Sequence, residues 1–137
     1  MAFTGGDITE ITYNHPELGS GTLFTKANED GTIDLGGYRS NDDANMVTGN
    51  GQFIDQLNRV RGRFESPPIA WDMVSADELK QLTDMTESPV LADWTITSIT
   101  GTVWAGRGKP VGDIQGNTNQ ATNSLTIAFE GKLQKIS

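Results

Sequence analysis

Apolar and polar residues alternate with a period of two in several short stretches, a pattern typical of strands with one buried face. The clearest case is residues 124–133, whose apolar face consists of Leu125, Ile127, Phe129 and Leu133. Looser alternation, with many β-branched and aromatic residues, predicts further strands at 7–13, 22–26, 32–35, 52–65 and 92–105. Turns rich in Gly, Pro and Asn separate these stretches. The pattern therefore predicts a mainly β (α+β) domain, with 32–35 returning antiparallel to 22–26.

One stretch has helical periodicity instead. A helix is predicted at about residues 76–87, with an apolar stripe of Leu79, Leu82 and either Met85 or Thr86. Ser75 and Glu78 have the spacing of a capping box, and Pro89 ends the pattern. We expect this helix to pack on a sheet or to cover the end of a barrel.

A long polar segment, residues 37–51, interrupts what otherwise reads as a hairpin. Loops longer than about 12–15 residues are uncommon in compact domains unless they have a function. We therefore expect an extended loop that becomes ordered against another chain. The candidate contact residues in this loop are Tyr38, Arg39, Asp42, Asp43, Asn45 and Met46.

The strand predicted at 52–65 exceeds the usual length of about 5–6 residues, and Gly62 is a candidate bulge. Arg59, Arg61 and Arg63 alternate along one of its faces. Such a row can bind nucleic acid or an acidic ligand. We prefer pairing with carboxylates of a neighbouring strand or subunit, because few aromatic residues interleave for base stacking. A long strand edge is also a template for pairing between chains.

Composition narrows the function classes. The 137 residues predict one domain spanning 1–137, with no cysteine and a single histidine, His15, which we interpret as a turn residue. A thiolate, a histidine metal cage and an acid–base pair built on histidine are thus excluded, and no cofactor is expected. The net charge of −8 argues against wrapping nucleic acid. No signal peptide or membrane span is recognisable, which predicts assembly in the cytoplasm without membrane insertion.

Motifs for phosphate, metal and catalysis are weak. Residues 106–112, GRGKPVG, lack the Walker A spacing, so we interpret 106–120 as a polar loop. Four nearby aspartates lack the order of an EF-hand loop: Asp30, Asp34, Asp42 and Asp43. Acidic pairs such as Asp93 with Asp113 leave a small hydrolase as a weak possibility, because no separation follows from sequence. We expect no enzymatic activity.

Aromatic residues supply the main alternative. Trp71, Trp94 and Trp104 can form a platform for sugar rings, although tryptophan in a small β domain more often belongs to the core or an interface. A small β-domain binding module for carbohydrate or peptide is therefore the competing function. A monomer that binds glycans distinguishes it from an assembly subunit.

The order of several segments resembles the tail tube proteins of contractile-tailed bacteriophages. These segments are the long polar loop, NRVRG, SPPIAWDM, DELKQLTDMTESP, the junction ESPVLADWTI and the loop GRGKPVGD before a final strand ending in FEG. The resemblance covers nearly the whole chain, and the order and total length carry it. It implies a small antiparallel β-barrel or sandwich with one flanking helix, a design shared with the haemolysin-coregulated protein of type VI secretion.

The resemblance also implies a function. Six copies form a ring whose sheets join into one inner barrel, rings stack into a tube, and the long loop reaches the adjacent ring. Tail sheath, tape measure, baseplate and tail terminator proteins are the implied partners, and genomic DNA passes through the lumen without specific binding. The protein would be assembled in the host cytoplasm and reside in the virion tail. A tailocin or a secretion device remains open beside a phage, and the family has no catalytic residues.

Overall fold

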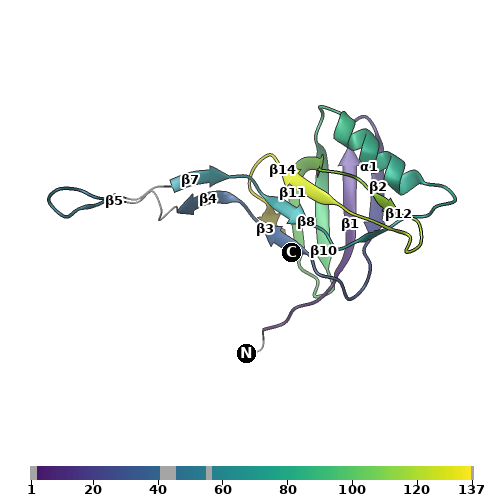
Figure 1. Cartoon of the computed structure of the whole chain (residues 1–137), viewed down its shortest axis with the longest axis horizontal. Helices are drawn as coiled ribbons and strands as arrows, with labels where there is room; N and C mark the ends of the chain where they lie inside the picture. Colours follow the sequence, from purple (N-terminus) through teal and green to yellow (C-terminus); the bar gives the residue numbers. More distant parts are fainter. Residues whose placement is uncertain (1–2, 41–45, 55–56, 137) are drawn as a thin grey trace.

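The computed structural model describes residues 3–40, 46–54 and 57–136 (Figure 1). Its main sheet is antiparallel, with the strand order β2-β1-β10-β11-β14-β8-β3, and β15 also pairs with β11. The strands of this sheet are β1 (Ile8–His15), β2 (Gly19–Phe24), β3 (Thr32–Asp34), β8 (Arg63–Glu65), β10 (Ala92–Ser98), β11 (Val103–Val111), β14 (Thr126–Phe129) and β15 (Gln134–Lys135). The expected mainly β fold with antiparallel sheets and one helix is confirmed.

A second, small sheet brings the two ends of the main sheet together. It has the order β12-β13-β9 and consists of β9 (Ile69–Ala70), β12 (Gly116–Asn117) and β13 (Thr122–Asn123). Strand β9 follows β8 after a short stretch containing two prolines, and Ile69 forms a bridge with Thr25 just beyond β2. The Lys26 amide donates to the Pro68 carbonyl at 2.8 Å. The sheet therefore rolls up, so that its first and last parts meet through β9.

Helix α1 (Asp77–Glu87) packs on this rolled sheet and contacts β11 (Figure 1). Leu82 and Met85 are its buried residues, which confirms these two positions of the predicted apolar stripe, and Leu79 is half-buried. They join one core cluster with the inward residues of the strands, among them Ile11, Leu23, Phe64, Trp94, Ile96, Ile127 and Phe129. Leu125, Ile127, Phe129 and Leu133 are all buried, as the alternation predicts. Among the residues that the structure describes, no helix has the length and apolar character needed to cross a membrane.

The predicted capping box is wrong. Ala76, not Ser75, precedes the helix; it has φ 57° and makes no side-chain cap. The Ala76 amide donates to the Asp72 carbonyl at 2.7 Å, which closes a turn before the helix begins. Because this turn comes first, Glu78 faces the amide of Asp72 at 3.4 Å rather than that of Ser75.

Three predicted connections also differ. Residues 92–105 are not one strand but the hairpin β10–β11, and Gly101, at φ 91°, lies in its turn instead of forming a bulge. Residues 106–111, expected in a loop, belong to β11, where Gly108 and Pro110 are buried. Strand β3 pairs with β8 and not with 22–26. The three errors share one cause, because a local pattern does not show which segments pair with each other, and pairing depends on distant residues that close the core.

Candidate functional site

A two-stranded ribbon, which we call the arm, projects from the rolled sheet (Figure 1). Its base pairs β4 (Gly37–Ser40) with β7 (Leu57–Val60), and its far part pairs β5 (Met46–Val47) with β6 (Phe53–Ile54). The turn between β5 and β6 is closed by two backbone–backbone hydrogen bonds, one of which joins the Thr48 amide to the Gln52 carbonyl at 2.7 Å. Residues 37–51, which we predict as an unpaired loop, thus include β4 and β5, and their partner strands β6 and β7 come from the segment predicted as a strand at 52–65.

The absence of a period-two alternation of apolar and polar residues explains why residues 37–51 are predicted as an unpaired loop. An arm exposed on both faces needs no apolar face, so its strands lack the period-two pattern that identified the others. The strand predicted at 52–65 is interrupted between β7, which ends at Val60, and β8, which begins at Arg63. The division between β7 and β8 falls at Gly62, the predicted irregularity, whose amide donates to Gly131 at 2.7 Å and whose carbonyl accepts from Phe129 at 2.9 Å. The arm therefore begins next to Gly62, whose two backbone hydrogen bonds attach this point of the chain to the rolled sheet.

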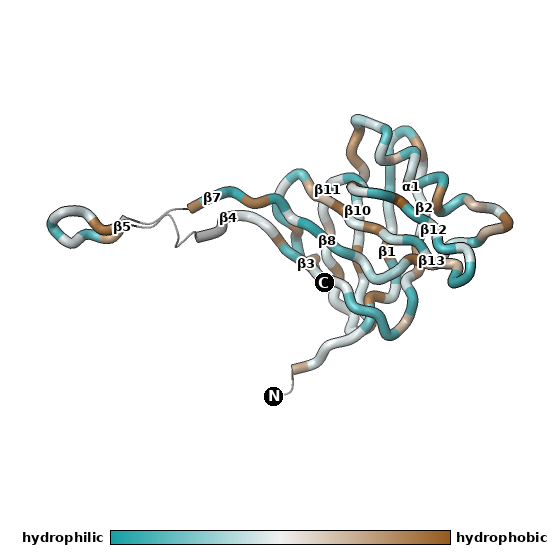
Figure 2. Tube along the Cα trace, in the orientation of Figure 1, coloured by the Kyte–Doolittle hydropathy of each residue, from teal (hydrophilic) through white to brown (hydrophobic). Residues whose placement is uncertain are grey.

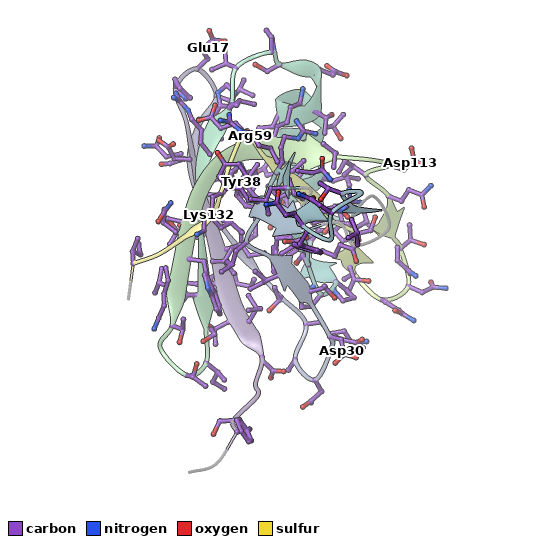
Figure 3. The ribbon with its side chains drawn as sticks, turned by 90° about the vertical axis from the view of Figure 1, so that its left-hand side faces the viewer. Glu17, Asp30, Tyr38, Arg59, Asp113 and Lys132 are labelled. Atoms are coloured by element: carbon purple, nitrogen blue, oxygen red, sulfur yellow. The ribbon has the colours of Figure 1, made fainter. Side chains whose placement is uncertain are left out.

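A groove of about 410 Å³ lies at the root of the arm, and we call it the root groove. It is lined by Gly37, Tyr38, Arg59, Val60, Arg61, Glu130, Gly131 and Lys132. Figure 3, which looks along the arm, shows Tyr38, Arg59 and Lys132 near one another. The Arg59 guanidinium carbon lies 5.6 Å from the centroid of the Tyr38 ring, a cation–π contact between paired residues of β7 and β4. Three cations and one carboxylate thus surround the groove.

The predicted contact residues divide into four groups. Tyr38, Arg59 and Arg61 come together in the root groove. Arg63 lies on β8, where its Nε is 3.4 Å from a carboxylate oxygen of Glu65 on the same strand, whereas the predicted partner was a carboxylate of a neighbouring strand or subunit. Arg39 lies opposite Asn58 in β4–β7, and Met46 lies opposite Ile54 in β5–β6. Asp42, Asp43 and Asn45 lie outside the described residues.

Exposed apolar side chains follow the arm, and the sequence reasoning missed most of them. Val47 and Phe53 face each other across β5–β6, with 66% and 68% of their surfaces exposed. Leu57 and Tyr38 are exposed to 60% and 67% at the base. Figure 2 shows the apolar positions near β5 and at the start of β7. The sequence does contain a signal for them, since large apolar residues occur in or beside a polar segment. That signal indicates an exposed apolar surface only when the two strands of the segment are known to pair.

Two of the three tryptophans that would support a ligand-binding module are buried in the domain. Trp94 is buried and donates from Nε1 to the Gly108 carbonyl at 2.9 Å. Trp71 is 9% exposed and donates to the Asn117 carbonyl at 3.2 Å. The three indole rings therefore do not share one exposed platform. Within 3–40, 46–54 and 57–136, no group of three His, Asp or Glu side chains is placed to hold a metal ion.

His15 is buried and is the last residue of β1, where it pairs with Gly19 of β2. Its Nδ1 accepts hydrogen bonds from the amides of Glu17 and Leu18, both at 3.1 Å, and its Nε2 lies 3.1 Å from the Val90 carbonyl. The ring is 2% exposed and joins the β1–β2 turn to the segment before β10. These contacts give the histidine a structural role beside the turn, although it belongs to the strand and not to the turn in which it was predicted.

The fold and the arm define the chain as a small β-rich domain that carries a projecting β ribbon. No protein-family model matches the sequence, and no characterised protein matches it at a significant level of similarity. The features that bear on function are therefore those of the molecule itself: the arm, its exposed apolar residues and the basic root groove.

Proposed function

We propose that this chain is a structural subunit whose hexameric rings stack into the inner tail tube of a contractile phage tail. The observation that carries the proposal is the arm. A two-stranded ribbon alone is at best marginally stable in water, and this one projects away from the core with Val47 and Phe53 exposed. Covering those side chains with a neighbouring subunit removes apolar surface from water, at roughly 25 cal/mol per Å².

Strand edges add a second reason. Within the described residues, β4 and β7 pair only with each other, so each has one free edge. Strands β2 and β3 terminate the main sheet, although residues just after β2 contact β9. Free edges are templates for pairing with another chain. Main-chain pairing around a ring would close the sheets into one barrel without edges.

The proposed tube also defines the partners and the location of the chain. Tail sheath proteins would surround it, the tape measure protein would occupy it during assembly, and baseplate and terminator proteins would bind its two ends. Genomic DNA would pass through the lumen towards the host without specific binding. The subunits would assemble in the host cytoplasm and reside in the virion. The alternative, a carbohydrate- or peptide-binding module, has less support because Trp71 and Trp94 are buried.

Negative-stain microscopy of the purified protein tests this proposal. We expect rings or tubes from the wild-type chain. Deleting Ser40–Thr48 is expected to leave a soluble subunit that forms no tubes, because the deletion removes one side of the arm. A milder variant, Phe53→Ser, is expected to weaken assembly, whereas Ile99→Ser, at a comparably exposed turn residue on the domain, serves as the control.

Circular dichroism must show that the deletion variant keeps its β-sheet content. Tubes of normal length from the deletion variant would contradict the role of the arm. A wild-type chain that remains monomeric and binds glycans would instead support the binding module.

A further inference from the structure

Basic residues gather at the root of the arm although the whole chain is acidic. Ten Lys and Arg residues stand against eighteen Asp and Glu. Five of the ten lie in the arm, beside it or at its root: Arg39, Arg59, Arg61, Arg63 and Lys132. Arg59, Arg61 and Lys132 line the root groove with a single acid, Glu130. The groove is therefore a basic site on a protein of net charge −8.

The opposite charge gathers on helix α1 and the turn before it. Residues 72–87 contain five acids (Asp72, Asp77, Glu78, Asp84 and Glu87) and one base, Lys80, a net charge of −4. Lys80 is already engaged, because its Nζ lies 2.9 Å from Asp84, and this bond raises the pKa of Lys80. Figure 1 places α1 at the end of the domain away from the arm. A single chain therefore cannot bring its own acidic end to its root groove.

The turn at 72–76 together with Asp77, the first residue of α1, presents apolar residues between two acids, and we call this segment the acidic turn. Val74 is 95% exposed and Met73 is 59% exposed. Asp72 orders the turn by accepting a hydrogen bond from the Val74 amide at 3.0 Å, and its carbonyl accepts from the Ala76 amide. A large exposed side chain held in an ordered turn is typical of an interaction surface, since ordering it costs little entropy on binding.

We propose that the root groove of one copy receives the acidic turn of a second copy. Arg59 and Arg61 then face the carboxylates of Asp72 and Asp77, while Val74 contacts the exposed rim that Tyr38 and Leu57 provide. Charge complementarity favours this occupant, because two copies of net charge −8 repel each other unless opposite patches meet. The contact is heterologous, so repetition yields a closed ring or an open filament. It rests on the proposed tube function and names the surfaces that the subunits use.

Neutral substitutions test the two surfaces separately. A groove variant carries Arg59→Gln and Arg61→Gln, and a turn variant carries Asp72→Asn and Asp77→Asn. Asparagine keeps the oxygen that accepts from the Val74 amide, so the turn variant preserves that bond. A control variant carries Arg107→Gln and Lys135→Gln, which removes the same charge as the groove variant outside the root groove.

Sedimentation velocity and equilibrium at low salt measure association. We expect the groove and turn variants each to weaken self-association by about tenfold or more, as removal of close interface charges does. The control should associate like the wild type. An equimolar mixture of the two variants should form a heterodimer of twice the 14.8 kDa chain mass, because one intact groove meets one intact turn. The heterodimer cannot grow, since its remaining groove and turn are both neutralised.

The outcomes separate this inference from the tube function. Tubes that form equally well from wild-type, groove and turn variants overturn the inference and leave the tube proposal standing. Salt-sensitive oligomers that the variants abolish, without rings or tubes in micrographs, support the inference against the tube. A mixture that contains only monomers overturns the inference. So does a groove variant that loses affinity for double-stranded DNA while its self-association is unchanged, because the groove would then bind nucleic acid.

Discussion

At the residue scale, a few buried polar groups determine how the strands fit together. Tyr13 is 7% exposed and its ring centroid lies 5.6 Å from that of Trp94. Its phenol lies over Gly21 on β2, where a side chain would overlap the hydroxyl. Trp94 in turn donates to the Gly108 carbonyl of β11. Two aromatic rings therefore connect β2, β1, β10 and β11 across the core.

Burial raises the pKa of Tyr13 above its ordinary value of 10.0, and the nearby charge of Glu78 adds to the shift. The unfolded chain would ionise this tyrosine at lower pH than the folded chain, so its contribution to stability is complete below pH 10 and declines as the pH rises towards the folded pKa. We expect urea unfolding between pH 8 and 11 to show this loss, and Tyr13→Phe to remove part of it.

The second tyrosine of the chain provides the control. Tyr38 is exposed on the arm, so Tyr38→Phe should leave the alkaline loss of stability unchanged. Equal pH dependence in the wild type and in Tyr13→Phe would show that Tyr13 does not cause it.

At the element scale, β11 shows how a glycine-rich sequence can form a central strand. Its residues GRGKPV, expected in a polar loop, form part of this strand although Gly and Pro are depleted in strands. Both glycines are needed for close contact with β14 and its neighbours. A methyl group on Gly108 would overlap the Ala128 carbonyl oxygen, and one on Gly106 would lie 2.7 Å from side-chain atoms of Phe129 and Leu133. Backbone proximity, not local propensity, therefore explains these residues.

Gly108→Ala is expected to destabilise the domain by about 3 kcal/mol or more, because backbone atoms of β14 cannot move away as a flexible side chain can. Urea unfolding followed by tryptophan fluorescence measures the change. Gly131→Ala is the matched control, since no atom lies within 4 Å of the added methyl. Similar stabilities for the two variants would contradict the close approach of β11 and β14.

At the scale of the whole molecule, basic and acidic residues are concentrated at different ends of the long axis. The arm and its basic root lie at one end and the acidic helix lies towards the other (Figure 1). The net charge of −8, repeated around a ring, would produce a strong negative field in a narrow channel. We therefore predict a lumen with more Asp and Glu than Lys and Arg, and expect Arg59 and Arg61 at contacts between subunits.

An acidic lumen has a measurable consequence. Assembled tubes should retain no double-stranded DNA fragments at about 0.15 M salt, because like charges repel and no counterions are released on binding. Filter retention of labelled DNA measures this, with a basic protein as the positive control. Strong, steeply salt-dependent retention would contradict the acidic lumen even if the tubes form, and a structure of the assembly would show the lining residues directly.

The sequence by itself determined the β-rich class, the single helix, the inward face of residues 124–133 and the position of the arm. Each of these follows from a local signal: alternation, helical spacing, or a long polar stretch with few large apolar residues. The break at Gly62 was also visible, because glycine weakens a strand.

Only the tertiary structure decided which strands pair, and hence where the root groove lies. Lys132 and Arg59 are far apart in the sequence, and they meet because Gly62 bonds to Gly131 and Phe129 at the start of the arm. The pairing of β3 with β8 and the burial of Trp71 and Trp94 likewise depend on long-range contacts. A local pattern records which face of a strand is apolar, whereas the choice of partner depends on the packing of the whole core.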